Sequence, residues 1–252
     1  MTGTCGENLS WTLDGDTLTI SGTGDMYDLQ NFSEVGESIE RVIIEEGATS
    51  IGNFAFSFCA NIIAVTLPDS LSKICVGAFN FCESLTEIKI PANVTTIGNA
   101  GFCGCWSLRE ISLPANLVDI GDNAFINCSN LRVIELPDGL LRIGDNAFKG
   151  CENLTEIKIP ASVVAVGGEV FAGCEALEKI YCAASLDFAK KLRGGNNAEL
   201  VAANETIEKF TWQLDGDTLK ICGAGSVEKI FCDETAPWYD KRESIKKIII
   251  ES

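Results

Sequence analysis

The sequence predicts a solenoid of six stacked coils built from short parallel strands. The hexapeptide IGDNAF occurs at 120–125 and again at 143–148, an interval of 23 residues. The same interval divides residues 42–179 into six consecutive units without insertion or deletion. Seven positions of the unit are apolar in every copy. A unit of this length cannot bury its own apolar face, whereas stacked units bury a continuous one.

The units start at Val42, Val65, Ile88, Ile111, Ile134 and Ile157. When each is numbered from its first residue, positions 1, 3, 7, 10 and 21 are aliphatic in all copies. Position 15 is always phenylalanine and position 18 always cysteine, so we expect a spine of rings and thiols inside the solenoid. These residues are Phe56, Phe79, Phe102, Phe125, Phe148 and Phe171, and Cys59, Cys82, Cys105, Cys128, Cys151 and Cys174.

Each coil is expected to contain a strand followed by a turn. From position 21 to position 3, as in 131–136, apolar and polar residues alternate, which is typical of a short strand. Proline follows at position 4 in five of the six units and ends the strand because it has no N–H. The Ile-Gly pair at positions 10 and 11 is expected to turn the chain. Asp122-Asn123 and Asp145-Asn146 then offer side-chain oxygens suited to capping a short helical turn.

The pattern L-x-x-I-x-I-P-x-x-V-x-x-I-G-x-x-A-F-x-x-C, best seen at 108–128 and 131–151, resembles the BspA-like class of leucine-rich repeats. The resemblance covers residues 39–182 and implies a leucine-rich repeat solenoid with helical or irregular turns. It also implies a bacterial cell-surface protein, often of an anaerobe, with an adhesive role.

One position departs from the general leucine-rich pattern, which has Asn or Cys at its ninth place. This chain has Gly47, Ser70, Asn93, Asn116, Gly139 and Ser162 there. The usual asparagine ladder is therefore mostly missing, which argues against a tightly curved horseshoe but not against a solenoid.

The ends of the array depart from the repeat, as a solenoid requires if its core is to be covered. Residues 1–38 are expected to form a small β cap, because SWTLDGDTLTISGTG has two alternating runs around the turn dipeptide Asp14-Gly15. The solenoid then occupies 39–182. Residues 183–209 are expected to be a C-terminal capping segment and linker. The residues that favour a short amphipathic helix there, ended by GGNN, are Leu186, Ala189, Lys190 and Leu192.

Residues 210–252 read as a second copy of the β cap that leads into a further array. Ten of the 14 residues from Trp11 to Gly24 recur at an offset of 201. ESIKKIIIES at 243–252 likewise resembles ESIERVIIEE at 37–46. We therefore expect the chain to be one period of a longer tandem protein.

Composition disfavours several classes of partner and chemistry. Nineteen Lys and Arg against 36 Asp and Glu give a net charge of −17, which repels nucleic acid and anionic lipid surfaces. No apolar run approaches the roughly 20 residues of a membrane-spanning helix. Met1 is followed directly by TGTCGENLSW, so either the chain is cytosolic or a leader has been removed.

Histidine is absent, and no Ser, Cys or Lys lies in a recognisable nucleophile motif. We therefore predict no enzyme activity, no cofactor and no metal.

The cysteines are expected to be structural. A column spreads its thiols along an axis and lacks the clustered ligands of a zinc site, although disulfides along it are an alternative. Cys103-Gly-Cys105 is the only close pair, which is weak evidence for redox or metal chemistry. The other cysteines outside the column are Cys5, Cys75, Cys182, Cys222 and Cys232. Asp14-Gly15-Asp16 and Asp215-Gly216-Asp217 are interpreted as turns rather than calcium loops.

The strand face is the candidate binding surface. Positions 22, 23 and 2 lie between buried positions and must point outward. They differ between coils while the core positions repeat, which suits recognition on a fixed frame. The candidate ligand-binding residues are Arg109, Arg132, Glu135, Lys158 and Tyr181. The alternative is a solvated face on which Glu87 pairs with Lys89 and Glu156 with Lys158.

The leading hypothesis is a non-catalytic secreted or cell-surface protein that binds host proteins, matrix or other cells through this face. We expect a monomer with a protein or glycan ligand and without membrane insertion in this segment. The adhesive role is implied by the resemblance alone. Two alternatives stay open: a spacer or substrate-targeting module of a larger surface enzyme, and an intracellular interaction scaffold.

Overall fold

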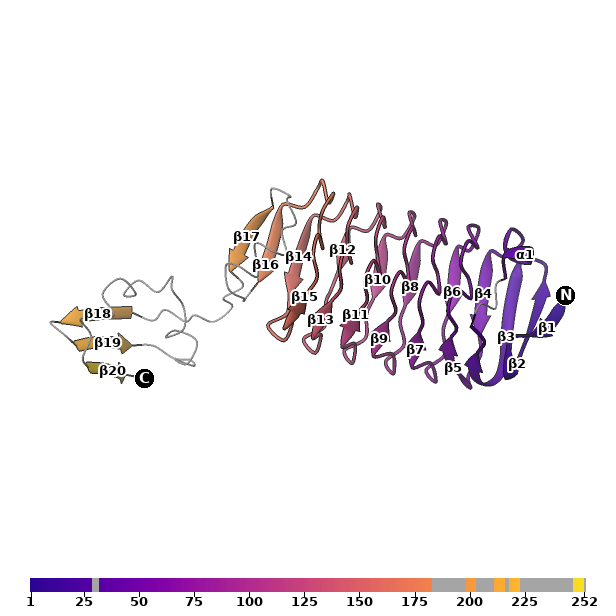
Figure 1. Ribbon diagram of the computed structural model, residues 1–252, viewed down its shortest axis with the longest axis horizontal. Helices are drawn as coiled ribbons and strands as arrows, with labels where there is room; N and C mark the ends of the chain where they lie inside the picture. Colours follow the sequence, from indigo (N-terminus) through magenta and orange to yellow (C-terminus); the bar gives the residue numbers. More distant parts are fainter. Residues whose placement is uncertain (29–31, 183–197, 203–210, 216–217, 223–246, 252) are drawn as a thin grey trace. The chain divides into compact units, whose positions relative to one another are not determined.

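The computed structural model describes residues 1–28, 32–182, 198–202, 211–215, 218–222 and 247–251 (Figure 1). They belong to two compact units, Met1–Ala202 and Ala203–Ser252. The first unit contains the predicted solenoid. Among the described residues, no helix is both long and apolar enough to cross a membrane.

The first unit opens with three antiparallel strands, β1 (Thr2–Thr4), β2 (Gly6–Asp14) and β3 (Thr17–Met26). The β2–β3 hairpin expected here is present, and its loop contains Gly15 with a positive φ of 58°. Glycine is favoured at the first residue of such a loop because it has no Cβ to clash.

Strand β3 connects this hairpin to the first coil. Its first half pairs in parallel with β4 (Arg41–Ile44), and its second half pairs with β5 (Ala48–Ile51). One long strand therefore covers the open edges of both ladders of the solenoid, as an end cap must.

The first ladder is parallel and in register from β4 to β16, interrupted between β6 and β8 and between β12 and β14. Each paired residue lies opposite the one 23 positions later, so that Glu110 lies between Glu87 and Val133. Some strands are shorter than expected: the strand predicted at 131–136 contains only Val133–Ile134. After β4, the ladder consists of β6 (Ala64–Thr66), β8 (Glu87–Lys89), β10 (Glu110–Ser112), β12 (Val133–Ile134), β14 (Glu156–Ile159), β16 (Lys179–Cys182) and β17 (Glu199–Ala202).

A second parallel ladder, which the sequence analysis did not predict, runs along positions 9 and 10. In four of the six coils the strand ends at isoleucine and glycine follows it; the exceptions are Ile74-Cys75 and Val166-Gly167. A Cβ on Gly98 would lie 2.6 Å from the backbone carbon of Cys75 in the preceding coil, so glycine permits this close approach. After β5, the strands are β7 (Lys73–Ile74), β9 (Thr96–Ile97), β11 (Asp119–Ile120), β13 (Arg142–Ile143) and β15 (Ala165–Val166).

The prediction of a capped helical turn after Ile-Gly is wrong. The only helix among the described residues is α1 (Ser33–Gly36), in the N-terminal cap. Positions 12–17 instead form a third set of bonds between coils, as where Phe125 N donates to the Ala147 carbonyl oxygen at 2.8 Å. Asp122 Oδ1 accepts a hydrogen bond from the Asp145 N–H of the next coil, at 3.0 Å, and so does not cap a turn of its own. Stacking satisfies the backbone groups that a helix would have bonded internally.

This third side has an alternating backbone. Positions 13 and 17 have positive φ in every coil, for example Asn123 at 58° and Asn127 at 60°. Asparagine and glycine tolerate this left-handed conformation better than other residues. The Asp-Asn dipeptides are therefore explained by backbone conformation and by bonding to the neighbouring coil.

The predicted spine of rings and thiols is confirmed. All six repeat phenylalanines are 0% exposed, and neighbouring rings stack with centroids 5.3–5.6 Å apart. The stack continues into the cap through Phe32, 5.3 Å from Phe56, and ends at Trp11, whose ring meets Phe32 edge-on at 5.7 Å. The column cysteines are buried free thiols, so the disulfide alternative is not seen among the described residues.

The coils lie side by side in a nearly straight row, in agreement with the expectation against a tightly curved horseshoe (Figure 1). Asn93 Nδ2 donates to the Asp69 carbonyl oxygen at 2.7 Å, and Asn116 Nδ2 to that of Ala92 at 3.0 Å. Ser70 and Ser162 hydroxyls bridge to the preceding coil in the same way.

The second unit contains the antiparallel pair β18 (Thr211–Asp215) and β19 (Thr218–Cys222) and a strand β20 (Lys247–Glu251) parallel to β19. The same order of pairing joins β2, β3 and β4 in the first unit. The amphipathic helix predicted around Leu186 lies outside the described residues. The division into segments at 38, 182 and 209 stays a prediction.

Candidate functional site

The five candidate residues lie on one face of the first ladder, across four consecutive coils. Arg109 and Arg132 are exposed at the same position of adjacent coils, where Arg132 N donates to the Arg109 carbonyl oxygen at 3.3 Å. Glu135 and Lys158 are also exposed. Lys158 lies directly opposite Tyr181, which is half-buried, in the register of β14 and β16. The ladder thus places these side chains on one surface, and their role in binding stays a prediction.

Two groups of ion pairs lie away from this face. Arg142 binds Asp119, at 3.0 Å, and Asp122, while Lys149 binds Glu169 at 2.6 Å. Glu87 and Lys89, which the alternative explanation of the face pairs with each other, form no ion pair among the described residues. Glu87 instead lies opposite Glu110 in the strand register, which places two like charges on neighbouring coils.

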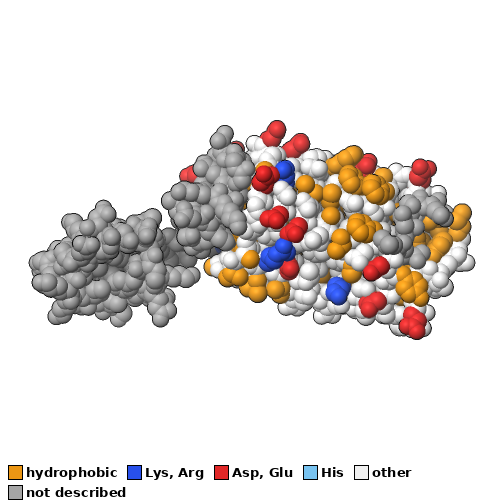
Figure 2. Space-filling view, viewed as in Figure 1, with side chains coloured by type: hydrophobic (Ala, Val, Ile, Leu, Met, Phe, Trp, Pro, Cys, Tyr) orange, Lys and Arg blue, Asp and Glu red, His pale blue; other side chains and the backbone are white. Residues whose placement is uncertain are grey.

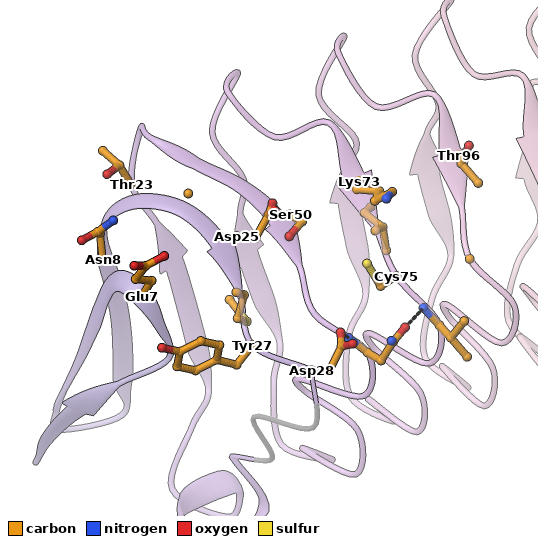
Figure 3. A pocket seen from close by; sticks show the side chains of 16 residues that line it. Glu7, Asn8, Thr23, Asp25, Tyr27, Asp28, Ser50, Lys73, Cys75 and Thr96 are labelled. Atoms are coloured by element: carbon orange, nitrogen blue, oxygen red, sulfur yellow. Dashed lines mark hydrogen bonds between the residues drawn. The ribbon is translucent and has the colours of Figure 1, made fainter.

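A groove that the sequence analysis did not find lies where β3 meets the second ladder. Its volume is about 860 Å³, within the size range of small-ligand sites. Carboxylates of Glu7, Asp25 and Asp28, the phenol ring of Tyr27 and the Lys73 amine line it (Figure 3).

Hydrogen bonds to neighbouring coils fix the floor of this groove. Thr49 Oγ1 donates to Asp25 Oδ1 at 2.7 Å, and hydrogen bonds from Thr49 and Ser50 lower the pKa of Asp25. Asn53 N donates to Asp28 Oδ1 at 2.9 Å. Asn53 Oδ1 in turn accepts from Val76 N at 2.9 Å, the bond dashed in Figure 3. The carboxylates of Asp25 and Asp28 are thus held in place by the coil stack.

The thiol of Cys75 lies in the same groove and is half-buried. Burial raises its pKa, and the carboxylates of Asp28 and Asp25 add to this effect while Lys73 opposes it. Because the thiolate is the reactive form, the raised pKa makes Cys75 a poor nucleophile. The groove can bind polar groups, but this thiol is not tuned for covalent chemistry.

The groove could not be read from the repeat because half of its lining comes from outside the repeat. Asp25 lies near the end of β3, and Tyr27 and Asp28 follow that strand, whereas Lys73 and Cys75 belong to the second coil. The one available signal is the short run Asp25-Met26-Tyr27-Asp28, in which exposed acidic and aromatic residues end a strand. In the described part of the chain, no three His, Cys, Asp or Glu side chains lie close enough together to hold a metal ion.

The family model for the BspA type leucine-rich repeat region matches residues 29–140 and 119–192, in six copies. These ranges cover more than half of the chain. The chain belongs to the BspA-type leucine-rich repeat family. The predicted resemblance and fold class are therefore confirmed, and the protein is a repeat scaffold of a kind that suits protein interaction.

Solved structures of bacterial leucine-rich repeat proteins are similar to this BspA-type chain. A leucine-rich repeat protein of T. pallidum is 28% identical, with 78% of this chain and 98% of that chain covered and a TM-score of 0.60. A leucine-rich cell surface protein of Faecalibacterium prausnitzii is 17% identical, with 100% and 95% covered and a TM-score of 0.39. The pneumococcal vaccine antigen PcpA is 14% identical, with 98% of each chain covered and a TM-score of 0.41. No curated protein sequence matches the chain.

Proposed function

We propose that this protein is a non-catalytic binding scaffold at the cell surface or outside the cell, and that its strand face recognises a protein or glycan ligand that carries acidic groups. The five residues of that face, Arg109, Arg132, Glu135, Lys158 and Tyr181, form the binding surface. The similarity to the T. pallidum leucine-rich repeat protein supports a repeat scaffold but does not indicate which ligand it binds.

The observation that carries this proposal is the position of Arg109 and Arg132. They are exposed just before β10 and β12, on adjacent coils joined there by a backbone hydrogen bond, so two positive charges extend from backbones about 5 Å apart. Neighbouring like charges destabilise a sheet, and core packing does not require these residues. An acidic ligand group would relieve the repulsion and accept bidentate hydrogen bonds from the guanidinium groups.

The extracellular location rests on the family and is compatible with the thiols. Free cysteines are unusual in oxidising surroundings. The column thiols, however, are at most 2% exposed, so oxidants and other thiols have little access to them. Burial therefore lets a thiol-rich chain persist outside the cell.

The proposal is tested with the wild-type protein on an array of matrix proteins and acidic and neutral glycans. Replacing Arg109, Arg132 and Lys158 together with Glu is expected to weaken binding of acidic array components by at least about tenfold, because charged contacts become repulsive. The midpoint of urea unfolding should change little, because all three side chains are exposed.

The matched control replaces Arg41, Lys89 and Lys179, on the same face, with Glu. It changes the net charge equally but leaves the five proposed residues intact, so it should retain most of the binding. Absence of binding by the wild-type protein, or equal loss in both variants, would contradict recognition by these residues. If the chain is instead a spacer, or a targeting module that does not use this face, the wild type and the two variants should not differ in binding.

A further inference from the structure

Three aromatic side chains form a surface cluster on the third side of the first three coils. We call Phe58, Phe81 and Trp106 the aromatic patch. Phe58 is 63% exposed and Trp106 43%, and Phe81 is half-buried between them. The rings of Phe58 and Phe81 stack with centroids 5.1 Å apart, and Trp106 meets Phe81 edge-on at 6.3 Å.

The backbone at these phenylalanines is unfavourable for them. Phe58 and Phe81 have φ values of 64° and 56°. The left-handed conformation costs a residue with a Cβ roughly 1–2 kcal/mol relative to glycine. In the other four coils the same position is occupied by glycine or asparagine, at Gly104, Asn127, Gly150 and Gly173. The coil therefore does not need aromatic residues here, and they are retained at a cost in stability.

The surroundings of the patch are almost free of charge. Positions 12–20 of the first three units, residues 53–61, 76–84 and 99–107, contain one charged residue, Glu83. The same positions of the last three units contain six: Asp122, Asp145, Lys149, Glu152, Glu169 and Glu175. Since 22% of the whole chain is charged, the first half of this side is depleted and the second is not. In the upper part of the face shown in Figure 2, hydrophobic side chains gather over the N-terminal coils, whereas charged side chains are more frequent over the C-terminal ones.

We propose that the aromatic patch is a docking surface for a protein partner that presents uncharged, apolar side chains. Enrichment in aromatic residues with depletion of charge is the composition that marks the centre of protein interfaces. This uncharged area, on a chain with a net charge of −17, also matches a partner surface without charge. A charged partner surface would find no opposite charge in the patch with which to form a favourable electrostatic contact.

Ring orientation favours a protein over a sugar as the occupant. Phe58 and Phe81 are nearly parallel, with 7° between their planes, so each covers one face of the other. Phe81 is also in contact with Trp106, so the three rings form one apolar area that can pack against apolar side chains. A saccharide stacks on an open ring face, which this pair does not offer between its rings.

The test uses a variant in which each ring is replaced by the residue that the fourth unit has at the same position. Phe58→Asn and Phe81→Asn copy Asn127, and Trp106→Ser copies Ser129. Because asparagine fits the left-handed backbone better than phenylalanine, this ring variant should unfold at the same or a higher urea concentration than the wild type. Loss of binding can then be separated from loss of fold.

The control removes a similar apolar area elsewhere. Val118, Leu141 and Val164 are exposed at position 8 of three other coils. In the control they become Thr, Ser and Thr, the residues found at this position in the first three units. A change in binding caused by general surface hydrophobicity would appear in this control as well.

The probe is a panel of immobilised synthetic peptides of about 12 residues, uncharged and rich in Leu, Ile and Phe. Controls are the same peptides with Glu or Lys at the apolar positions, and an array of neutral oligosaccharides. We expect the wild type and the control variant to bind uncharged peptides with little dependence on salt, and the ring variant to bind them at least about tenfold more weakly.

Three outcomes would overturn the proposal. The first is that no uncharged peptide binds the wild type, or that the ring variant binds as tightly as the wild type. The second is that only oligosaccharides bind in a ring-dependent manner, which would assign the patch to glycans. The third is that ring-dependent self-association, measured by sedimentation, replaces peptide binding, which would make a second copy of the chain the occupant.

Discussion

The thiol of Cys128 donates a hydrogen bond to the carbonyl oxygen of Phe102 in the preceding coil, with 3.1 Å between sulfur and oxygen. The same bond, 26 residues apart, is made by Cys82, Cys105, Cys151 and Cys174. It links the two invariant columns of the repeat. Cysteine suits this place because it is small enough for the core and carries a weak donor for a buried carbonyl.

The first prediction concerns the reactivity of the column thiols. Burial raises the pKa of Cys59 and of Cys174 to about 12. Because only the thiolate is alkylated readily, both should resist iodoacetamide near pH 8 in the folded protein and react fully in urea. Mass spectrometry of labelled peptides measures this. Half-buried Cys103 is the internal control and should react first. Equal labelling rates at Cys103 and Cys59 would contradict a closed core.

The same thiols predict how stability depends on pH. Their folded pKa lies above the ordinary value of 9.0, so the unfolded chain releases its thiol protons first. Their contribution to stability is complete below pH 9 and is lost as pH rises from 9 to about 12. The expected slope is about 1.4 kcal/mol per pH unit for each such thiol. Urea unfolding across this range checks it, and Cys174→Ala should give a shallower decline.

The second prediction compares two phenylalanines of one coil. Phe79 is 0% exposed and stacks between Phe56 and Phe102, whereas Phe81 lies in the aromatic patch. Phe79→Ala should lower the free energy of unfolding by about 3–5 kcal/mol, because it leaves a cavity in the ring stack. Phe81→Asn should change it by less than about 1 kcal/mol, because the left-handed backbone is relieved while some ring contact is lost. Equal losses in urea unfolding would contradict a spine formed by position 15.

Much of the coil could be predicted from the sequence because its core positions repeat without a gap. Phe56 and Cys59 need no knowledge of the fold to be placed inside: the same residue types recur six times at these positions. The end of the spine was harder to see. Phe32 lies 24 residues before Phe56, one more than the repeat, so its place in the stack depends on the path of the cap.

The third side was mispredicted because two local structures need the same residues. Asp122-Asn123 suits a helix N-terminus, yet it also suits an aspartate that accepts from the next coil and an asparagine at positive φ. Only the stacked neighbour decides between them. The groove was missed for a related reason, because Asp25 and Lys73 meet only when the cap packs on the second ladder.

A ladder of side-chain acceptors runs along position 12 and leads to the last prediction. Asn99 Oδ1 accepts from Asp122 N at 2.9 Å, and Asp145 Oδ1 accepts from Gly168 N at 2.6 Å. Asn53 Oδ1 accepts from Val76 N in the same manner. Val76 itself has no side-chain acceptor to offer the next coil, so the ladder is interrupted between the second and third coils.

Val76→Asn should therefore complete the ladder. The new amide oxygen would lie at the position that Asn53 and Asn99 use, within reach of the Asn99 N–H. We expect the free energy of unfolding to rise by about 0.5–1.5 kcal/mol, the net contribution of one hydrogen bond. Little burial is lost, because Val76 is already 37% exposed. Val76→Ala removes the same side chain without supplying an acceptor and should be neutral or slightly destabilising. If urea unfolding gives the two variants equal stability, the position 12 bonds contribute nothing to coil stacking.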